Sequence, residues 1–244
     1  MNQTTVLASG APADLSLPQR LLGMIVSPFP TFEAVVARPK WLGVLAFTTL
    51  LGALAWFTFL STSVGQQAFI DQQLHQRETW NQPITPEVEQ QIARTAPMMR
   101  FIIPASAVII GPIFGVIIAG VLYGIFGAMM GGGGSFKQTF AVITHAGVVP
   151  SIAGLGVLAL NYARETMNSA TNLAVFVQML PEESFVVRFL GMIDLVWVWY
   201  LIVLAIGLGV LYRRKASSIA YGFFGLYFVI ALVIAGVRSA LGGS

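Results

Sequence analysis

The chain has 244 residues, of which 56% are hydrophobic and only 9% are charged, whereas roughly a quarter of the residues in an ordinary soluble domain are charged. Together with a mean hydropathy of +0.79, this leaves too little polar surface for a water-soluble fold and makes lipid the expected solvent. The net charge of +3 is too small to indicate nucleic-acid binding, and the lack of cysteine excludes disulfides, thiolate catalysis and cysteine-based metal sites.

Residues 1–40 are predicted to form a cytoplasmic segment with two short amphipathic helices. Apolar residues recur at helical spacing from Leu17 to Val26, before a Ser-Pro-Phe-Pro sequence that ends the first helix. The second helix is expected to run from Thr31, as its N-cap, to Arg38. Two placements fit these helices equally: flat on the cytoplasmic membrane surface, or packed against the rest of the molecule as connectors.

Five apolar runs follow, each long enough for a transmembrane helix. A helix needs about 20 apolar residues to cross a hydrocarbon core of about 30 Å. The runs that reach this length are residues 41–63, 101–130, 136–162, 189–212 and 216–237. They predict an all-α fold, a polytopic transmembrane helix bundle that occupies residues 41–244 and has its longer loops, 64–100 and 163–188, on the outer side.

Prolines and caps refine these elements. Pro112 and Pro150 are expected to kink the second and third spanning helices, because a proline frees the carbonyl group one turn earlier. In the first outer loop, Thr85 as an N-cap followed by Pro86 predicts an extramembrane helix that runs toward Pro97. This loop is therefore expected to form a small helical cap on the bundle.

Basic residues predict the orientation of the bundle. Arg38 and Lys40 precede the first span, and Arg213–Lys215 lie between the fourth and fifth spans. The positive-inside tendency assigns these segments to the cytoplasm. With five spans, the N-terminus is then cytoplasmic and the C-terminus is outside.

Asp194 lies inside the fourth predicted span, which begins at Phe189. A carboxylate at such a position costs several kcal/mol unless it is paired or faces water. Its expected partners are polar residues near the same membrane surface: Asn161, Tyr162, Arg164 and Arg188. A structural polar bridge, a proton or cation site, and simple exposure to water are the three interpretations of this residue.

His145 is predicted to lie about 13 Å inside the third span, at a rise of 1.5 Å per residue. It has no histidine, cysteine or carboxylate nearby in the span, so an ordinary zinc site is excluded. An interhelical hydrogen bond and a proton relay are the two interpretations. The expected kink at Pro150, five residues further on, is a feature with which transporters build binding sites.

Glycines mark two further candidate features of the membrane domain. The run that joins the second and third spans either presents backbone N–H groups to a lipid phosphate or forms a tight turn. The candidate residues of this run are Gly132, Gly133, Gly134, Ser135 and Lys137. Glycines at four-residue spacing along the second span predict a face for helix packing or oligomerisation: Gly111, Gly115, Gly120, Gly124, Gly127 and Gly131.

Signatures of enzymes are missing from the sequence. It contains neither His-Glu-x-x-His nor Gly-x-Ser-x-Gly, and the predicted spans hold no close pair of carboxylates. No catalytic residue, metal ligand or cofactor is therefore predicted.

Several segments together resemble the Yip (Ypt-interacting protein) family of five-span membrane proteins, in its prokaryotic branch. They occur in the family's order along almost the whole chain: Ser27–Phe32 (SPFPTF), Arg38–Trp41 (RPKW), Gly134–Phe140 (GSFKQTF), Pro150, Trp199–Leu201 (WYL), Gly207 and Lys215–Ala216. The resemblance implies a cytoplasmic N-terminus and a location in a bacterial inner membrane. It also implies a non-enzymatic role, since eukaryotic members organise membrane traffic and bind small GTPases. No residue roles carry over, because the acidic motifs of those members that contain Tyr-Gly are absent.

Two hypotheses of function follow. The first is a membrane scaffold or adaptor that assembles through its glycine faces, with membrane lipids and other membrane proteins or a second copy of the chain as partners. The second is a small transporter, channel or lipid-handling protein that uses the buried polar residues near Asp194 and His145.

Overall fold

The computed structural model describes residues 14–181 and 184–241, and in this part of the chain the regular structure is helical apart from one isolated β-bridge. Residues 1–13 of the predicted N-terminal segment lie outside the described residues. Five helical segments are long and apolar enough to cross a membrane: α3 (Leu42–Leu60), α5 (Pro86–Leu122) with the π-helical turn Tyr123–Met129, α6 (Phe136–Ala146) with α7 (Val148–Ala163), α9 (Leu195–Tyr212) and α10 (Ala216–Leu241). The predicted all-α transmembrane bundle is thus confirmed, and the chain is an integral membrane protein.

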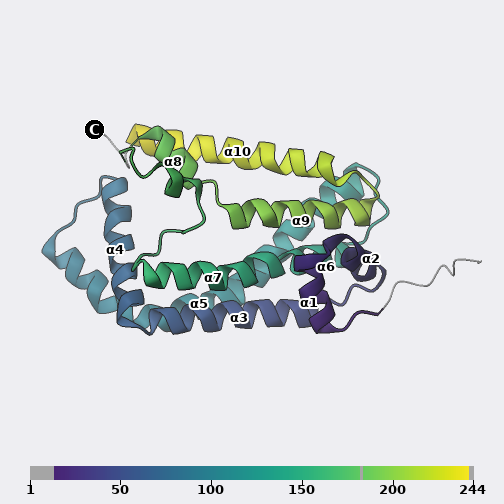
Figure 1. Cartoon of the computed structure of the whole chain (residues 1–244), viewed down its shortest axis with the longest axis horizontal. Helices are drawn as coiled ribbons and strands as arrows, with labels where there is room; N and C mark the ends of the chain where they lie inside the picture. The colour runs from purple at the N-terminus through teal and green to yellow at the C-terminus, as the bar shows by residue number, and fades with distance from the viewer. Residues whose placement is uncertain (1–13, 182–183, 242–244) are drawn as a thin grey trace, which may run out of the picture.

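The spanning helices run roughly side by side, and the remaining helices gather at the two ends of the bundle (Figure 1). One end, here called the basic end, holds α1 (Leu17–Val26), α2 (Pro28–Ala37), the start of α6 and the turn between α9 and α10. The opposite end holds α4 (Ser63–Thr79), α8 (Phe185–Gly191) and the longer connections. The basic connections and the longer loops, which the sequence predicted on opposite sides of the membrane, therefore lie at opposite ends of the molecule.

The two N-terminal helices pack on the bundle. The second helix does not begin at Thr31 as expected; α2 begins at Pro28, and Thr31 lies inside it with its hydroxyl donating to the Ser27 carbonyl at 2.8 Å. Proline favours the first helical turn because its missing N–H would have no partner there and its φ already suits a helix. Phe32 of α2 is fully buried, which shows that this helix contributes to the core.

The main core lies between α2, α6 and α9 at the basic end of the bundle. Val142 of α6 and Leu208 of α9 are fully buried there with Phe32. Gly207 allows this contact, because a Cβ on it would lie 2.6 Å from Val142 Cγ1 and 2.8 Å from the Phe32 ring. A smaller second core joins α3, α4 and α5 at the opposite end, around Leu60.

Helix α5 is longer than the sequence indicated. The predicted extramembrane helix begins as expected after Thr85, but it does not end at Pro97: one helix continues through three internal prolines to Leu122. Each proline removes only one helical hydrogen bond, and a membrane helix tolerates this when neighbouring helices hold the segment. The first outer loop and the second span are therefore one element.

Two spans are interrupted where the sequence suggested continuous helices. The third span breaks at Gly147 between α6 and α7, three residues before Pro150. The fourth does not begin at Phe189, because α8 ends at Gly191 and α9 starts at Leu195. This second break changes the environment of Asp194.

Candidate functional site

Asp194 is the N-cap of α9 and does not lie inside a spanning helix. Its Oδ1 accepts a hydrogen bond from the Val196 N–H at 2.8 Å, which satisfies one of the free donors of the helix start. Its Oδ2 accepts from the hydroxyls of Ser169 and of Thr171, the latter at 2.8 Å. Oδ1 thus caps α9, and Oδ2 holds the connection after α7 against the start of this helix.

Two of the expected partners of Asp194 have other contacts: Asn161, and Arg188, whose guanidinium donates to the Arg238 carbonyl. Asn161, buried near the end of α7, is satisfied when its amide nitrogen faces the carbonyl oxygens of Val157, at 3.3 Å, and Asn168, at 3.0 Å. Tyr227 of α10, which the sequence analysis did not single out, accepts from the Asp194 N–H at 3.1 Å and donates to the Met192 carbonyl at 2.7 Å. A tyrosine inside an apolar span needs a hydrogen-bond partner for its hydroxyl. The presence of a tyrosine in the fifth span was therefore the signal in the sequence that could have identified this contact.

His145 is fully buried at the basic end of the bundle. Its Nδ1 lies 2.7 Å from the carbonyl oxygen of Ala141, which can only accept, so Nδ1 carries the proton. Its Nε2 lies 3.4 Å from Nη1 of Arg20 on α1, and the same guanidinium nitrogen donates to the Lys40 carbonyl. The imidazole therefore joins α6 to the N-terminal segment.

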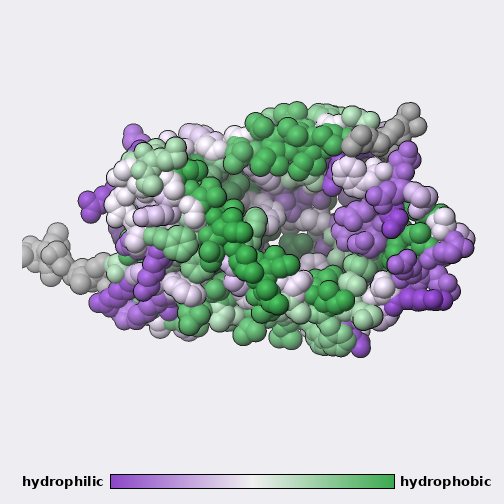
Figure 2. Space-filling view, turned by 180° about the vertical axis from the view of Figure 1, so that it is seen from behind, coloured by the Kyte–Doolittle hydropathy of each residue, from purple (hydrophilic) through white to green (hydrophobic). Residues whose placement is uncertain are grey.

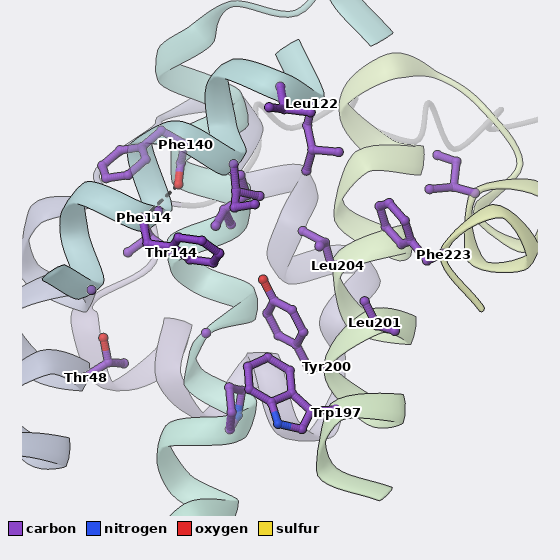
Figure 3. A pocket seen from close by; sticks show the side chains of 18 of the residues that line it. Thr48, Phe114, Leu122, Phe140, Thr144, Trp197, Tyr200, Leu201, Leu204 and Phe223 are labelled. Atoms are coloured by element: carbon purple, nitrogen blue, oxygen red, sulfur yellow. Dashed lines mark hydrogen bonds between the residues drawn. The ribbon is translucent and has the colours of Figure 1, made fainter. Parts of the chain in front are cut away.

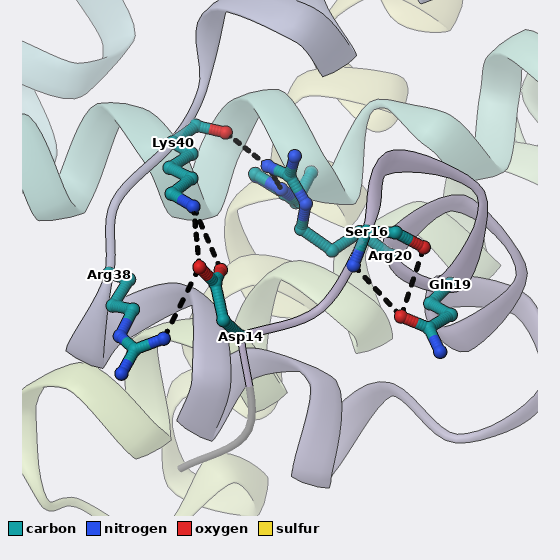
Figure 4. Close-up of polar contacts among 7 residues, drawn as sticks. Asp14, Ser16, Gln19, Arg20, Arg38 and Lys40 are labelled. Carbon is teal, nitrogen blue, oxygen red and sulfur yellow. Dashed lines mark hydrogen bonds and ion pairs between the residues drawn. The ribbon is translucent and has the colours of Figure 1, made fainter.

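The N-terminal segment is held at this end by a second set of charges (Figure 4). Asp14 accepts from Lys40 Nζ at 2.8 and 2.9 Å and lies 3.3 Å from Arg38. The hydrogen bond from Lys40, with the charges of Lys40 and Arg38, keeps the pKa of the Asp14 carboxyl below its ordinary value of 3.8. All of these groups are exposed, so their attraction is weakened by solvent.

The glycine run before α6 forms a tightly packed turn. A Cβ on Gly132 would lie 2.4 Å from the Tyr212 ring, and one on Gly134 would lie 2.9 Å from it. Ser135 and Gln138 form a capping box in which the Ser135 Oγ accepts from the Gln138 N–H at 3.3 Å. Close packing accounts for Gly132 and Gly134, while a lipid phosphate at Gly133, Ser135 or Lys137 stays a prediction.

The glycines of the second span do not share one environment. Gly111 and Gly115 line a cavity inside the bundle. A Cβ on Gly120 or on Gly124 would meet nothing within 4 Å. Gly127 lies against the ring of Tyr123, its own neighbour one turn earlier, and Gly131 has a φ of +68° in the turn. Only the pair Gly120 and Gly124 is left as an uncovered surface.

The cavity inside the bundle has a volume of about 1230 Å³. It is bounded by α3 and α5 on one side and by α9 and α10 on the other, with α6 and α7 between them. Figure 2 shows the molecule hollowed near its centre, with hydrophobic surface to the left of the hollow and hydrophilic surface to its right. Aromatic residues such as Phe114, Trp197 and Tyr200 point into it (Figure 3). Neither Asp194 nor His145 is among the residues that line it.

Three hydroxyl groups in the cavity wall are engaged by their own helices. Thr48 donates to the Val44 carbonyl at 2.9 Å, Thr144 to the Phe140 carbonyl at 2.8 Å, and Ser151 to a carbonyl one turn earlier at 2.8 Å. Such back-bonding occupies these three donors. The cavity wall thus behaves as an apolar surface despite these residues.

Metal-binding chemistry is not assembled by the described residues: no group of three His, Asp or Glu side chains there comes close enough to hold an ion. The polar groups that the sequence singled out serve helix ends and helix contacts instead. The exposed cations at the mouth of the cavity, Arg213, Arg214 and Lys215, were assigned in the sequence analysis to orientation alone. The spacing of these residues along the sequence could not predict that they lie beside an apolar cavity.

Comparison with family models connects this architecture to known proteins. A Yip1 domain model matches residues 22–240, from α1 to the end of α10. Neither the comparison with curated proteins nor that with solved structures gave a match. Because the matched region includes all five spanning segments and nearly the whole chain, the chain belongs to the Yip1-domain family of membrane proteins.

Proposed function

We propose that the chain is a non-enzymatic membrane scaffold or adaptor, which associates through α5 with a neighbouring helix from a second copy or another membrane protein. The observation that carries this proposal is the uncovered pair Gly120 and Gly124, where a methyl group would meet nothing within 4 Å. Small residues four apart let two helix backbones approach closely in lipid, where packing drives association. The π-helical turn that begins at Tyr123 interrupts α5 at the same place and changes the face that it presents.

The polar contacts support this function over a transporter that uses Asp194 and His145. Asp194 has both oxygens occupied by a helix cap and two hydroxyls. His145 is bonded on one nitrogen and lies against Arg20 on the other. A transported ion or proton would have to displace these structural contacts, and neither residue lines the cavity.

The scaffold proposal is tested by crosslinking the chain in native membranes. The lack of cysteine lets a single Gly120→Cys variant report contacts of this face, and Gly154→Cys serves as control because Gly154 of α7 also has open space around it. We expect Gly120→Cys to give one reproducible crosslinked species, and Gly124→Leu in the same chain to remove it. The proposal is contradicted if the Gly120→Cys chain stays monomeric and without a partner.

A further inference from the structure

The cavity between α3, α5, α9 and α10 combines an apolar wall with a cationic mouth. Its walls run along α10 from Lys215 to Leu226, which is roughly 16 Å at the rise of an α-helix. This is about half of the 30 Å hydrocarbon core of a bilayer. Along α9 the lining residues extend further, from Arg213 back to Trp197, which is roughly 24 Å at the same rise. The cavity therefore opens at one membrane surface and passes the midplane, a depth that accommodates an acyl chain.

Three cations lie at the end of the cavity that meets the membrane surface. Arg213, Arg214 and Lys215 line it in the turn between α9 and α10. None of the described lining residues is acidic, and none of the ion pairs among the described residues includes these three. Helix α10 begins at Ala216 directly after them, so the positive end of its dipole adds to the same charge.

The turn that carries these cations has a defined geometry. Arg213 ends α9 with a φ of +53°, a left-handed conformation that usually belongs to glycine at a helix end. The Arg214 N–H donates to the Gly209 carbonyl at 3.0 Å, and its guanidinium donates to the Met130 carbonyl at 3.2 Å. The turn is thus held on two sides, by α9 through Gly209 and by the connection before α6 through Met130.

We propose that this cavity binds one anionic phospholipid, with its phosphate at Arg213, Arg214 and Lys215 and an acyl chain along the apolar wall. Basic pockets between transmembrane helices are the sites where anionic headgroups bind. The volume of about 1230 Å³ exceeds the roughly 300–1,000 Å³ of ordinary small-molecule sites and suits a flexible hydrocarbon chain. The complementary charge at the mouth selects the headgroup, and the site goes beyond the scaffold role proposed above.

Native mass spectrometry of the full chain, extracted from vesicles of equal phosphatidylglycerol and phosphatidylcholine, tests the headgroup site. We expect one tightly retained phosphatidylglycerol. Removing all three charges by Arg213→Gln, Arg214→Gln and Lys215→Gln should weaken that preference by about fivefold for each charge. Lys40→Gln is the matched control, because Lys40 is an exposed cation near the same end that does not line the cavity.

The acyl-chain part of the site is tested by filling the cavity without changing its charge. Gly222 lines the cavity and Gly225 does not, although a Cβ on either would meet nothing within 4 Å. Gly222→Leu should lower retention of phosphatidylglycerol, and Gly225→Leu, on the same helix, should leave it unchanged. The proposal is overturned if the triple variant keeps the wild-type preference for phosphatidylglycerol, or if both leucine variants lose the lipid equally.

Discussion

The two halves of α9 have nearly the same apolar composition but different surroundings. From Val203 to Tyr212 the helix is mostly buried against α2 and α6, and Gly207 admits the Phe32 ring. From Leu195 to Ile202 the side chains are exposed or half-buried, and several of them border the cavity. Hydropathy places both halves in the membrane, but only the neighbouring helices decide which half is packed against protein and which against lipid.

The largest expected difference between the two halves comes from replacing a phenylalanine with alanine, once where it packs against the buried half and once at the cavity. Phe32→Ala should lower the free energy of unfolding by about 3–5 kcal/mol, because the ring is fully buried and leaves a void. Phe114→Ala should have little effect, since Phe114 is 61% exposed at the cavity. Thermal unfolding in detergent micelles measures both, and equal losses would show that the cavity wall is packed as tightly as the core.

Replacing a glycine with alanine in each region makes the same comparison more precise, because it adds one methyl group to each. Gly207→Ala should destabilise the chain by about 1–3 kcal/mol, because its Cβ would lie 2.6 Å from Val142. Gly222→Ala adds the same methyl group to open space and should be neutral or slightly stabilising. If Gly207→Ala is as stable as the parent chain, α2 does not pack on α9 as described.

A smaller effect is expected from a single hydroxyl. Tyr212 and Thr139 share a hydrogen bond of 2.6 Å in the packed half of the structure. Tyr212→Phe should cost roughly 0.6 kcal/mol, the typical value for such a bond between membrane helices. Tyr200→Phe, on the cavity side of the same helix, is the control and should leave the unfolding temperature unchanged.

The smallest effect concerns pH and the N-terminal segment that covers the packed half. The Asp14 pKa is lowered in the folded chain, first by the hydrogen bond from Lys40. The stabilising contact is therefore fully present above the ordinary pKa of 3.8 and is lost as the pH falls through the lower folded value. Amide exchange in α1 should accelerate only in this acid range, less steeply at high salt, and Asp14→Asn should remove the pH dependence.

The sequence predicted those features that depend on short stretches of chain. Five long apolar runs were enough to identify the spans, because each must satisfy its backbone hydrogen bonds within one helix. The helix start after Thr85 was also readable locally. The N-cap role of Asp194 was available from its residue type, since aspartate favours that position, but the apolar run on both sides of it obscured the break.

The cavity and its cationic mouth could not be predicted in this way. The cavity depends on the distance between α3–α5 and α9–α10, which no local pattern encodes. The residues that meet there are far apart in sequence, as Thr48, Gly111 and Arg214 illustrate. The interpretation of His145 as a helix contact likewise needed its neighbour, because Arg20 lies 125 positions away.

The central claim is that the open half of α9 faces a cavity filled by lipid. A fluorophore on Gly222→Cys, in a chain that otherwise lacks cysteine, tests this claim in vesicles. The account predicts that brominated acyl chains quench the fluorophore and that a water-soluble quencher does not. Quenching by the water-soluble reagent, or by neither reagent, would mean that water or a closely packed helix fills this space and would contradict the account.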